Sequence, residues 1–288
     1  CDMRLFMKLK PIDSRPLLWG FILLAACLLL PETALCGAFA ARISPPNFEL
    51  KAKPGELLRD VILIENAGED EATYQVRTAD WDLSDKGGVQ IYPADRPLPS
   101  ASCRPWTRIE QRAFKLQPGR RKTFRFEVHV PEDAASGECR FAIVISPAPE
   151  TVDAMNMGNI QIPVAGAIAV VVYVAIGEAK PDLEFKRIDL KRNTAESSPV
   201  VFLHNKGNAH ARPFGNVQIS DADGKKAELI ISPYPILPGR ASAINLSLDP
   251  EFSEIQDIND LKPPLRLKGL IEWEGGAYKL DTVFPETP

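Results

Sequence analysis

Apolar and polar residues alternate with a period of two along much of the chain beyond residue 41. In residues 124–130, Phe124, Phe126, Val128 and Val130 alternate with charged or polar side chains, which predicts a strand with one buried face and one wet face. Comparable short runs occupy residues 141–145, 200–203, 217–219, 229–231, 244–248, 265–273 and 278–284. No stretch of ten or more residues in this region has the 3.6-residue period of an amphipathic helix. The pattern therefore predicts an all-β protein.

Pro-Gly steps divide these segments, and each step stands just before an extended run. They are Pro54-Gly55, Pro118-Gly119 and Pro238-Gly239. Proline fixes φ and glycine accepts a positive φ, as the two central positions of a type II turn require. We therefore expect a tight turn at each step.

A different turn signal, Asn66-Ala67-Gly68, separates the alternating residues of 61–63 from those of 74–78, and this spacing predicts a β-hairpin. The segment that ends in this signal resembles residues 200–207, because both are apolar strands that end in Asn-x-Gly. The similarity predicts two copies of one sandwich type.

The sizes of the two copies match immunoglobulin-like domains of about 100 residues, the first enlarged by loops. We expect the first domain at residues 41–177 and the second at residues 178–288, joined near residues 177–181. The predicted fold is thus two tandem immunoglobulin-like β-sandwiches that follow an N-terminal export signal.

The export signal is predicted from residues 1–40. Basic residues precede the uncharged stretch 17–30, and a small-residue site, Ala38-x-Ala40, predicts cleavage between Ala40 and Ala41. The apolar stretch is shorter than the roughly 20 residues that a membrane-spanning helix needs, so a retained anchor is the less favoured alternative. A second alternative is a lipid attached at Cys27, which ends the lipobox-like run that begins at Leu24. Either way, the expected location is the periplasm or another exported compartment of the bacterial cell envelope.

Cysteine usage agrees with export. Removal of residues 1–40 leaves Cys103 and Cys139, and such a pair in an oxidising compartment is a disulfide candidate. Two separate buried thiols are the alternative.

Composition and motifs argue against several function classes. A net charge of −4 gives no electrostatic reason to expect nucleic acid. None of the common hydrolase, metalloprotease or phosphate-loop motifs is present, so we expect no enzyme and no cofactor. His204 and His210 lack partners at a metal-binding spacing, and Asp80 with Asp82, like Asp221 with Asp223, fits Asp-rich turns better than paired catalytic carboxylates.

The most informative stretch is residues 160–176, where even positions carry bulky, mostly β-branched residues and odd positions carry small ones. A transmembrane helix would not contain Pro163 after Gln161 and would need more length. Two interpretations stay open. In the first, the stretch is a core strand whose alternation reflects burial. In the second, Pro163 marks an edge strand whose bulky side chains are lent outward to a partner by strand addition.

Several of these features together resemble the periplasmic pilus-assembly chaperones, the PapD-like family. They are the two tandem sandwiches after a signal peptide, the early Pro-Gly turn and Asn-ending strand, the segment Phe114-Lys115-Leu116-Gln117-Pro118-Gly119, and the long alternating strand 160–176. The similarity covers most of residues 42–176 and is weaker beyond residue 181.

The resemblance implies a chaperone that binds a pilin-like or other exported subunit by β-strand donation and passes it to an outer-membrane usher. It implies that the inserted residues are Ile162, Val164, Ile168, Val170 and Val172. The family anchors the terminal carboxylate of its client with two basic residues. This sequence departs from that pattern, because Ala167 stands where the strand lysine is expected and the nearest arginine for the first strand, Arg42, comes too early.

A different class of function stays open beside this one. The chain is alternatively a non-catalytic interaction module of the cell envelope that binds another envelope protein, a polysaccharide or peptidoglycan. Its binding loops would then be residues 82–102 and 147–159.

Overall fold

The structure is a computed structural model of the chain. It describes residues 40–84, 87–93, 96, 99–148, 154–157, 160–163, 166–192, 197–253, 255 and 257–285, without the side chains of 154–157, 160–163, 191–192 and 197. Residues 1–39 of the predicted signal peptide, with the lipid site at Cys27, lie outside the described residues. Cleavage between Ala40 and Ala41 stays a prediction, and such a cut would remove the Ala40 carbonyl that accepts the Ala67 N–H at 2.9 Å. Among the described residues, no helix has the length and hydropathy to cross a membrane.

The described chain is built of strands, with two short 3-10 turns at Arg104–Trp106 and Ile258–Asp260, so the all-β prediction is confirmed. In chain order the strands are β1 (Ala41–Ser44), β2 (Asn47–Ala52), β3 (Leu57–Asn66), β4 (Ala72–Ala79), β5 (Trp81–Leu83), β6 (Val89–Ile91), β7 (Thr107–Ile109), β8 (Ala113–Leu116), β9 (Arg121–His129), β10 (Gly137–Pro147), β11 (Ala154–Met157), β12 (Ile160–Pro163), β13 (Ile168–Ile176), β14 (Leu183–Arg192), β15 (Ser197–Asn205), β16 (Asn216–Ser220), β17 (Lys226–Ile231), β18 (Ala241–Leu248), β19 (Leu265–Trp273) and β20 (Gly276–Phe284).

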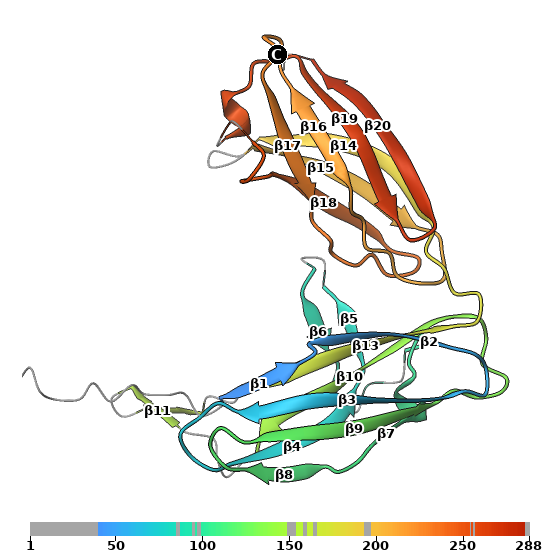
Figure 1. Cartoon of the computed structure of the whole chain (residues 1–288), viewed down its shortest axis with the longest axis vertical. Coiled ribbons are helices and arrows are strands. Elements are labelled where there is room, and N and C mark those ends of the chain that lie inside the picture. The colour runs from blue at the N-terminus through green and yellow to red at the C-terminus, as the bar shows by residue number, and fades with distance from the viewer. Residues whose placement is uncertain are drawn as a thin grey trace, which may run out of the picture. The chain divides into compact units, whose positions relative to one another are not determined.

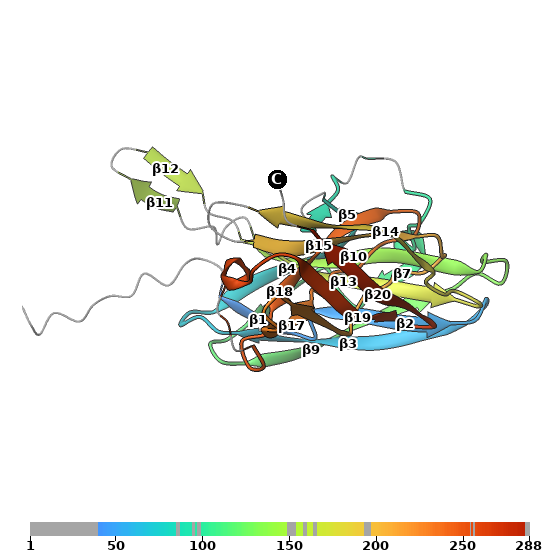
Figure 2. The same ribbon diagram turned by 90° about the horizontal axis from the view of Figure 1, so that it is seen from above.

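Strands β1–β13 form the first sandwich (Figure 1). One sheet has the order β1-β3-β9-β7 and the other the order β2-β13-β10-β4-β8. Their inward residues meet in one core, in which the ring of Phe126 contacts those of Phe48 and Phe141 edge to face. Two hairpins complete this half. The β5–β6 hairpin lies beside the main sheets, and the β11–β12 hairpin projects from them (Figure 2).

Strands β14–β20 form the second sandwich, whose sheet order is β14-β15-β18-β17-β16-β19-β20. The rings of Phe185 on β14 and Tyr278 on β20 stack with their centroids 4.2 Å apart, which joins the two outer strands of this order. Strand β18 changes neighbour along its length, pairing with β15 in its first half and with β17 in its last residues. The boundary between residues 177 and 178 stays a prediction.

The prediction of a hairpin across Asn66-Ala67-Gly68 was wrong. Strand β3 pairs with β1 and β9, whereas β4 pairs with β10 and β8 in the opposite sheet. Ile62 on β3 and Tyr74 on β4 are both buried in the core between the sheets, so the two strands pack face to face. A hairpin within one sheet and a pair of strands in facing sheets have the same sequence pattern. Each requires one buried face per strand and a turn between the strands.

The three Pro-Gly turns are confirmed. Gly55, Gly119 and Gly239 have φ of 79°, 66° and 71°, in the left-handed region that the turns were predicted to need. An added Cβ at Gly119 or Gly239 would meet no atom within 4 Å, so the requirement there concerns the backbone and not space.

Candidate functional site

The stretch from residue 160 to residue 176 is not one strand. Ile160–Pro163 forms β12 and pairs with β11, with Ile162 opposite Met155. Gly166 and Ala167 lie outside any strand, and the chain becomes extended again at Ile168, where β13 begins. Strand β13 then pairs with β10 over its whole length, from Ile168 opposite Ile145 to Ile176 opposite Gly137.

The bulky side chains of β13 face the core of their own sandwich. Val170, Val172 and Val174 are each 0% exposed. The expectation that Val170 and Val172 lend their side chains to a partner is therefore corrected, since these side chains already fill the space between the two sheets. Periodicity defines which residues share a face, but it does not say whether that face meets a second sheet of the same chain or of another.

For Ile162, Val164 and Ile168, contact with a partner stays a prediction. Ile168 is half-buried at the first position of β13. Ile162 belongs to the backbone of β12, and Val164 lies outside the described residues.

One side of β13 is left open at its beginning. Strand β2 runs parallel to β13 and pairs with it only from Asn47 opposite Val171 onward. Before that point the chain belongs to β1, which pairs with β3 in the other sheet. Pro45 and Pro46 join β1 to β2 and have no N–H, so they cannot extend the β2 ladder.

The open side belongs to the backbone of Ala169. Backbone groups of successive residues in a strand point to opposite sides. The Gly177 N–H donates to the Ala52 carbonyl of β2 at 2.9 Å, so the odd-numbered residues of β13 point toward β2. The Ala148 N–H donates to the Thr73 carbonyl of β4 at 2.9 Å, so the even-numbered residues of β10 point toward β4. This leaves the odd-numbered residues of β10 to bond the even-numbered residues of β13. Within the described residues, no strand lies on the side to which Ala169 points its N–H and C=O.

An apolar surface accompanies this open edge. The outward residues Ala169, Val171 and Tyr173 contact a cluster that includes Trp81 and Leu237. Trp81 meets the Tyr173 ring edge to face at 5.1 Å, and its indole N–H donates to the Phe141 carbonyl at 2.8 Å. Burial raises the pKa of the Tyr173 hydroxyl to about 12. The outer face of β13 is thus apolar at Ala169 and Val171, and at Tyr173 it carries a buried, neutral hydroxyl.

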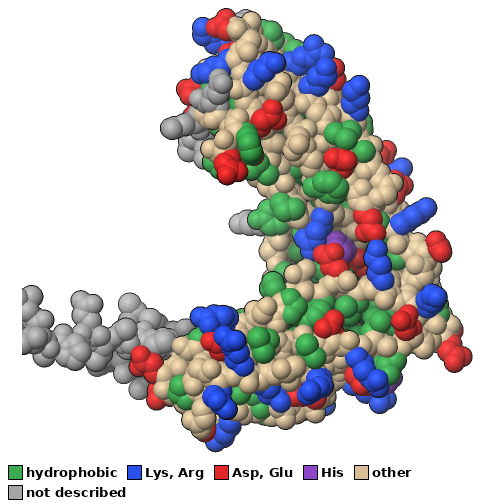
Figure 3. Space-filling view, viewed as in Figure 1, with side chains coloured by type: hydrophobic (Ala, Val, Ile, Leu, Met, Phe, Trp, Pro, Cys, Tyr) green, Lys and Arg blue, Asp and Glu red, His purple; other side chains and the backbone are tan. Residues whose placement is uncertain are grey.

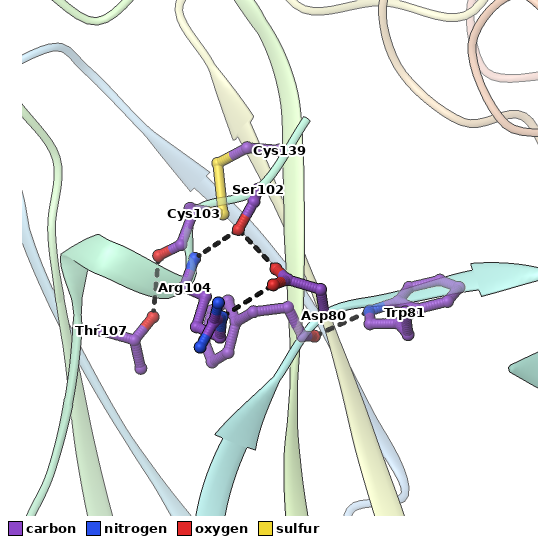
Figure 4. The surroundings of a disulfide bond; sticks show 8 residues. Asp80, Trp81, Ser102, Cys103, Arg104, Thr107 and Cys139 are labelled. Carbon is purple, nitrogen blue, oxygen red and sulfur yellow. Dashed lines mark hydrogen bonds and ion pairs between the residues drawn. A yellow bond between two sulfur atoms is a disulfide. The ribbon is translucent and has the colours of Figure 1, made fainter. Parts of the chain in front are cut away.

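The disulfide holds the region beside this surface. Cys103 and Cys139 form a disulfide with Cα atoms 5.4 Å apart. Next to it, buried Asp80 accepts hydrogen bonds from the Ser102 hydroxyl at 2.5 Å and from Arg104 Nε at 2.7 Å (Figure 4). A buried carboxylate with two such donors is a structural anchor.

The other acidic residues singled out from the sequence are also engaged in structural bonds. Asp82 accepts from the Tyr92 hydroxyl at 3.0 Å and from Arg240 at 2.7 Å. Asp221 accepts the backbone N–H groups of Asp223, Lys225 and Lys262, which places it in a turn. Neither aspartate pair presents two free carboxylates.

His210 connects the two sandwiches. Its ring stacks on Tyr173 with centroids 4.1 Å apart, its Nδ1 lies 2.5 Å from Glu138, and its Nε2 lies 3.4 Å from Glu49. Burial opposes ionisation of Glu49, but the hydrogen bond from Arg212 and the proximity of His210 outweigh it, so the pKa of Glu49 is lowered. Sequence reasoning missed this cluster because its members are far apart in the chain.

Within the described residues, neither His204 nor Arg42 belongs to a ligand-binding arrangement. His204 lies 3.8 Å from Glu184, and the described residues contain no group of three or more potential metal ligands. Arg42, the nearest candidate for a carboxylate anchor, is paired with Glu65 at 2.6 Å. Basic and acidic side chains are interspersed over the face shown in Figure 3.

Comparison with known proteins adds a likeness of fold. No protein-family model matches the chain, and no curated protein matches its sequence significantly. Solved structures with a similar backbone include the YadV chaperone, with a TM-score of 0.45, 11% identity and coverage of 85% of this chain and 100% of that one. They also include the class 5 fimbriae chaperone CfaA, at 0.42, 14%, 86% and 99%. A third is the CupB2 chaperone of Pseudomonas aeruginosa, at 0.42, 10%, 84% and 100%. At TM-scores below 0.5 and identities of 10–14%, these likenesses establish neither a shared family nor a shared function.

Proposed function

We propose that this protein is an exported, non-catalytic chaperone of the bacterial cell envelope that binds a pilin-like subunit by β-strand pairing at the start of β13. The observation that carries the proposal is the unpaired side of Ala169, beside which β2 has not yet begun because the preceding chain belongs to β1 in the other sheet. An exposed strand edge with apolar residues invites another strand, and a protein that keeps such an edge has a use for it.

The proposed complex depends on backbone hydrogen bonds. A client strand beside β13 would bond the N–H and C=O of Ala169, and its side chains would meet half-buried Ile168 and Val171. Ile162 and Val164 precede this edge in the chain, and we propose that they extend the contact. Because Arg42 is already paired with Glu65, we propose that the client is held without a carboxylate anchor on the first strand. Delivery to an outer-membrane usher is part of the same proposal.

The test removes one N–H. Ala169→Pro deletes the donor on the open side of β13 and leaves the bonds to β10 intact, since those belong to even-numbered residues. The proposal predicts a pilin-like subunit encoded beside this gene. The variant and the unaltered chain would each be co-expressed in the periplasm with that subunit, and the co-purified subunit would be measured. We expect recovery to fall at least tenfold, with the chain still folded.

The matched control is Ala169→Val, which keeps the N–H and has a high strand propensity, so subunit recovery should stay near that of the unaltered chain. Equal recovery with folded Ala169→Pro would contradict strand pairing at β13 and would favour binding through the loops. No complex with the unaltered chain would overturn the chaperone proposal itself.

A further inference from the structure

The second sandwich has an open strand edge of its own, at the start of β18. Residues Ala241–Asn245 pair with β15, but β17 pairs with β18 only from Ile231 opposite Leu246 onward. The segment that would continue β17 alongside β18 contains Pro233 and Pro235, which cannot donate to a ladder.

The unpaired groups belong to two alanines. The Asn205 N–H donates to the Arg240 carbonyl at 2.9 Å, so even-numbered residues at this end of β18 point toward β15. The Ser232 N–H donates to the Asn245 carbonyl at 3.4 Å, so odd-numbered residues point the other way. Within the described part of the chain, no backbone group bonds the N–H and C=O of Ala241 and Ala243 on that side.

This edge borders a cleft of about 440 Å³. Five consecutive residues, 241–245, line it. The face of a strand presents only alternate residues, so a consecutive run marks an exposed backbone edge. The opposite wall contains Asp82 and Leu83 of β5, and the ion pair from Arg240 to Asp82, at 2.7 Å, joins the two walls. The volume is in the range of pockets that hold small ligands or short peptide segments.

We propose that this cleft accepts a single extended, uncharged peptide segment of a partner protein, which pairs with Ala241 and Ala243 as an added strand. A second folded copy of the chain does not fit, because β5 closes the cleft opposite the edge. The residues Ala241–Ile244 offer roughly 13 Å of edge, enough for about four residues of a partner.

The side chains of the cleft define the chemistry of the segment. Among the described residues that line the cleft, Asp82 and Arg240 are charged, and they neutralise each other. The other described lining residues are uncharged, and apart from Asn245 their side chains are apolar or hydroxylic, including Leu237 and the exposed ring of Tyr234. A segment of alternating small hydroxylic and branched apolar residues complements this lining, whereas a lysine or glutamate would lose solvation without gaining a partner. The inference does not rest on the edge of β13.

The test uses the full chain labelled with ¹⁵N and the peptide acetyl-Thr-Val-Thr-Val-Thr-Val-amide as the probe. Without peptide, the amide hydrogens of Ala241 and Ala243 should exchange faster than those of Ser242 and Ile244, which bond β15. At millimolar peptide, we expect exchange at Ala241 and Ala243 to slow at least tenfold and their resonances to shift. Unchanged exchange and resonances would overturn the proposal.

Two variants test whether the peptide binds at the edge of β18 or at the edge of β13. Ala243→Pro removes the open N–H and should weaken peptide binding at least tenfold, while Ala169→Pro should leave it within twofold. The reverse pattern would overturn the proposal, because the peptide would then be bound at β13. If Ala243→Pro does not fold, a peptide with lysine at each threonine position replaces it as the comparison. Equal binding of that peptide would also overturn the proposal.

Discussion

The two sandwiches are held at the same place by the same residue. Asn66 in the first and Asn205 in the second are each about fully buried, and each side chain donates two hydrogen bonds to backbone carbonyls and accepts one from the glycine two residues later. The backbone carbonyl of each asparagine also accepts the glycine N–H of a Pro-Gly turn. The distances are 2.8 Å from Gly119 to Asn66 and 2.9 Å from Gly239 to Asn205. The repeat seen in the sequence is therefore a repeated clamp between a strand end and a turn.

The sandwiches differ in what else joins their parts. In the first, the disulfide ties Cys103 to β10, and buried Asp80, which follows β4, holds Ser102 and Arg104. The second has no cysteine and relies on β18, which pairs with strands of both halves of the sheet order. The difference indicates that a long segment outside the sheets needs covalent and ionic attachment, whereas a continuous strand order does not.

Removal of either clamp should have the largest effect. Asn66→Ala and Asn205→Ala each leave buried backbone groups unpaired, and at about 1–3 kcal/mol per group we expect a loss of about 3–5 kcal/mol from the free energy of unfolding of that sandwich. Urea unfolding followed by the fluorescence of Trp81 for the first sandwich and Trp273 for the second would measure it. The exposed Asn245 provides the control, since its replacement by alanine should cost less than about 0.5 kcal/mol. A loss below about 1 kcal/mol in either clamp variant would show that the two asparagines are not equivalent.

Loss of the disulfide should destabilise the first sandwich and not the second. The disulfide spans 36 residues of sequence, and the chain-entropy relation gives it about 4 kcal/mol. The double variant Cys103→Ser, Cys139→Ser should lower the free energy of unfolding of the first sandwich by about that amount and leave the second unchanged. Equal destabilisation of both would mean that the sandwiches unfold as one unit, which would remove the basis for comparing them.

Local signals in the sequence predicted the elements well. The alternation in 124–130 is strand β9, and the Pro-Gly steps have the backbone conformation that they were expected to have. Both depend on one residue and its neighbours, because φ preferences and side-chain alternation are properties of a short segment.

The pairing between strands that are distant in the chain could not be predicted from the sequence. The turn signal at Asn66 is the same whether the chain returns along its own edge or crosses to the facing sheet. Likewise, the alternation around Val172 is the same for a core strand and for a donated strand. The open edge at Ala169 depends on the residue at which β2 begins. Pro45 and Pro46 were the sequence signal for that boundary, because β2 begins directly after them.

Tyr173, which contacts His210 and Trp81, should make the stability of the first sandwich depend on pH in the alkaline range. Burial raises the pKa of Tyr173 to about 12 from its ordinary value of 10.0, so the folded protein favours the neutral hydroxyl. A pKa that is raised on folding contributes stability that is fully present below pH 10 and is lost as the pH rises to about 12. Two pKa units correspond to about 2–3 kcal/mol, and we expect the free energy of unfolding of the first sandwich to fall by that amount over this window.

Other groups titrate in the same range, so the informative quantity is a difference. The pKa values of Tyr74 and Tyr92 are also raised by burial, and they contribute to the alkaline loss of stability in every variant. Tyr173→Phe keeps the ring against His210 and removes only the titrating hydroxyl. The free energy of unfolding of the unaltered chain minus that of the variant should therefore be constant below pH 10 and decrease between pH 10 and pH 12. A constant difference across the whole range would mean that water reaches the hydroxyl, and then Tyr173 would not be buried under Trp81 and His210 on the outer face of β13.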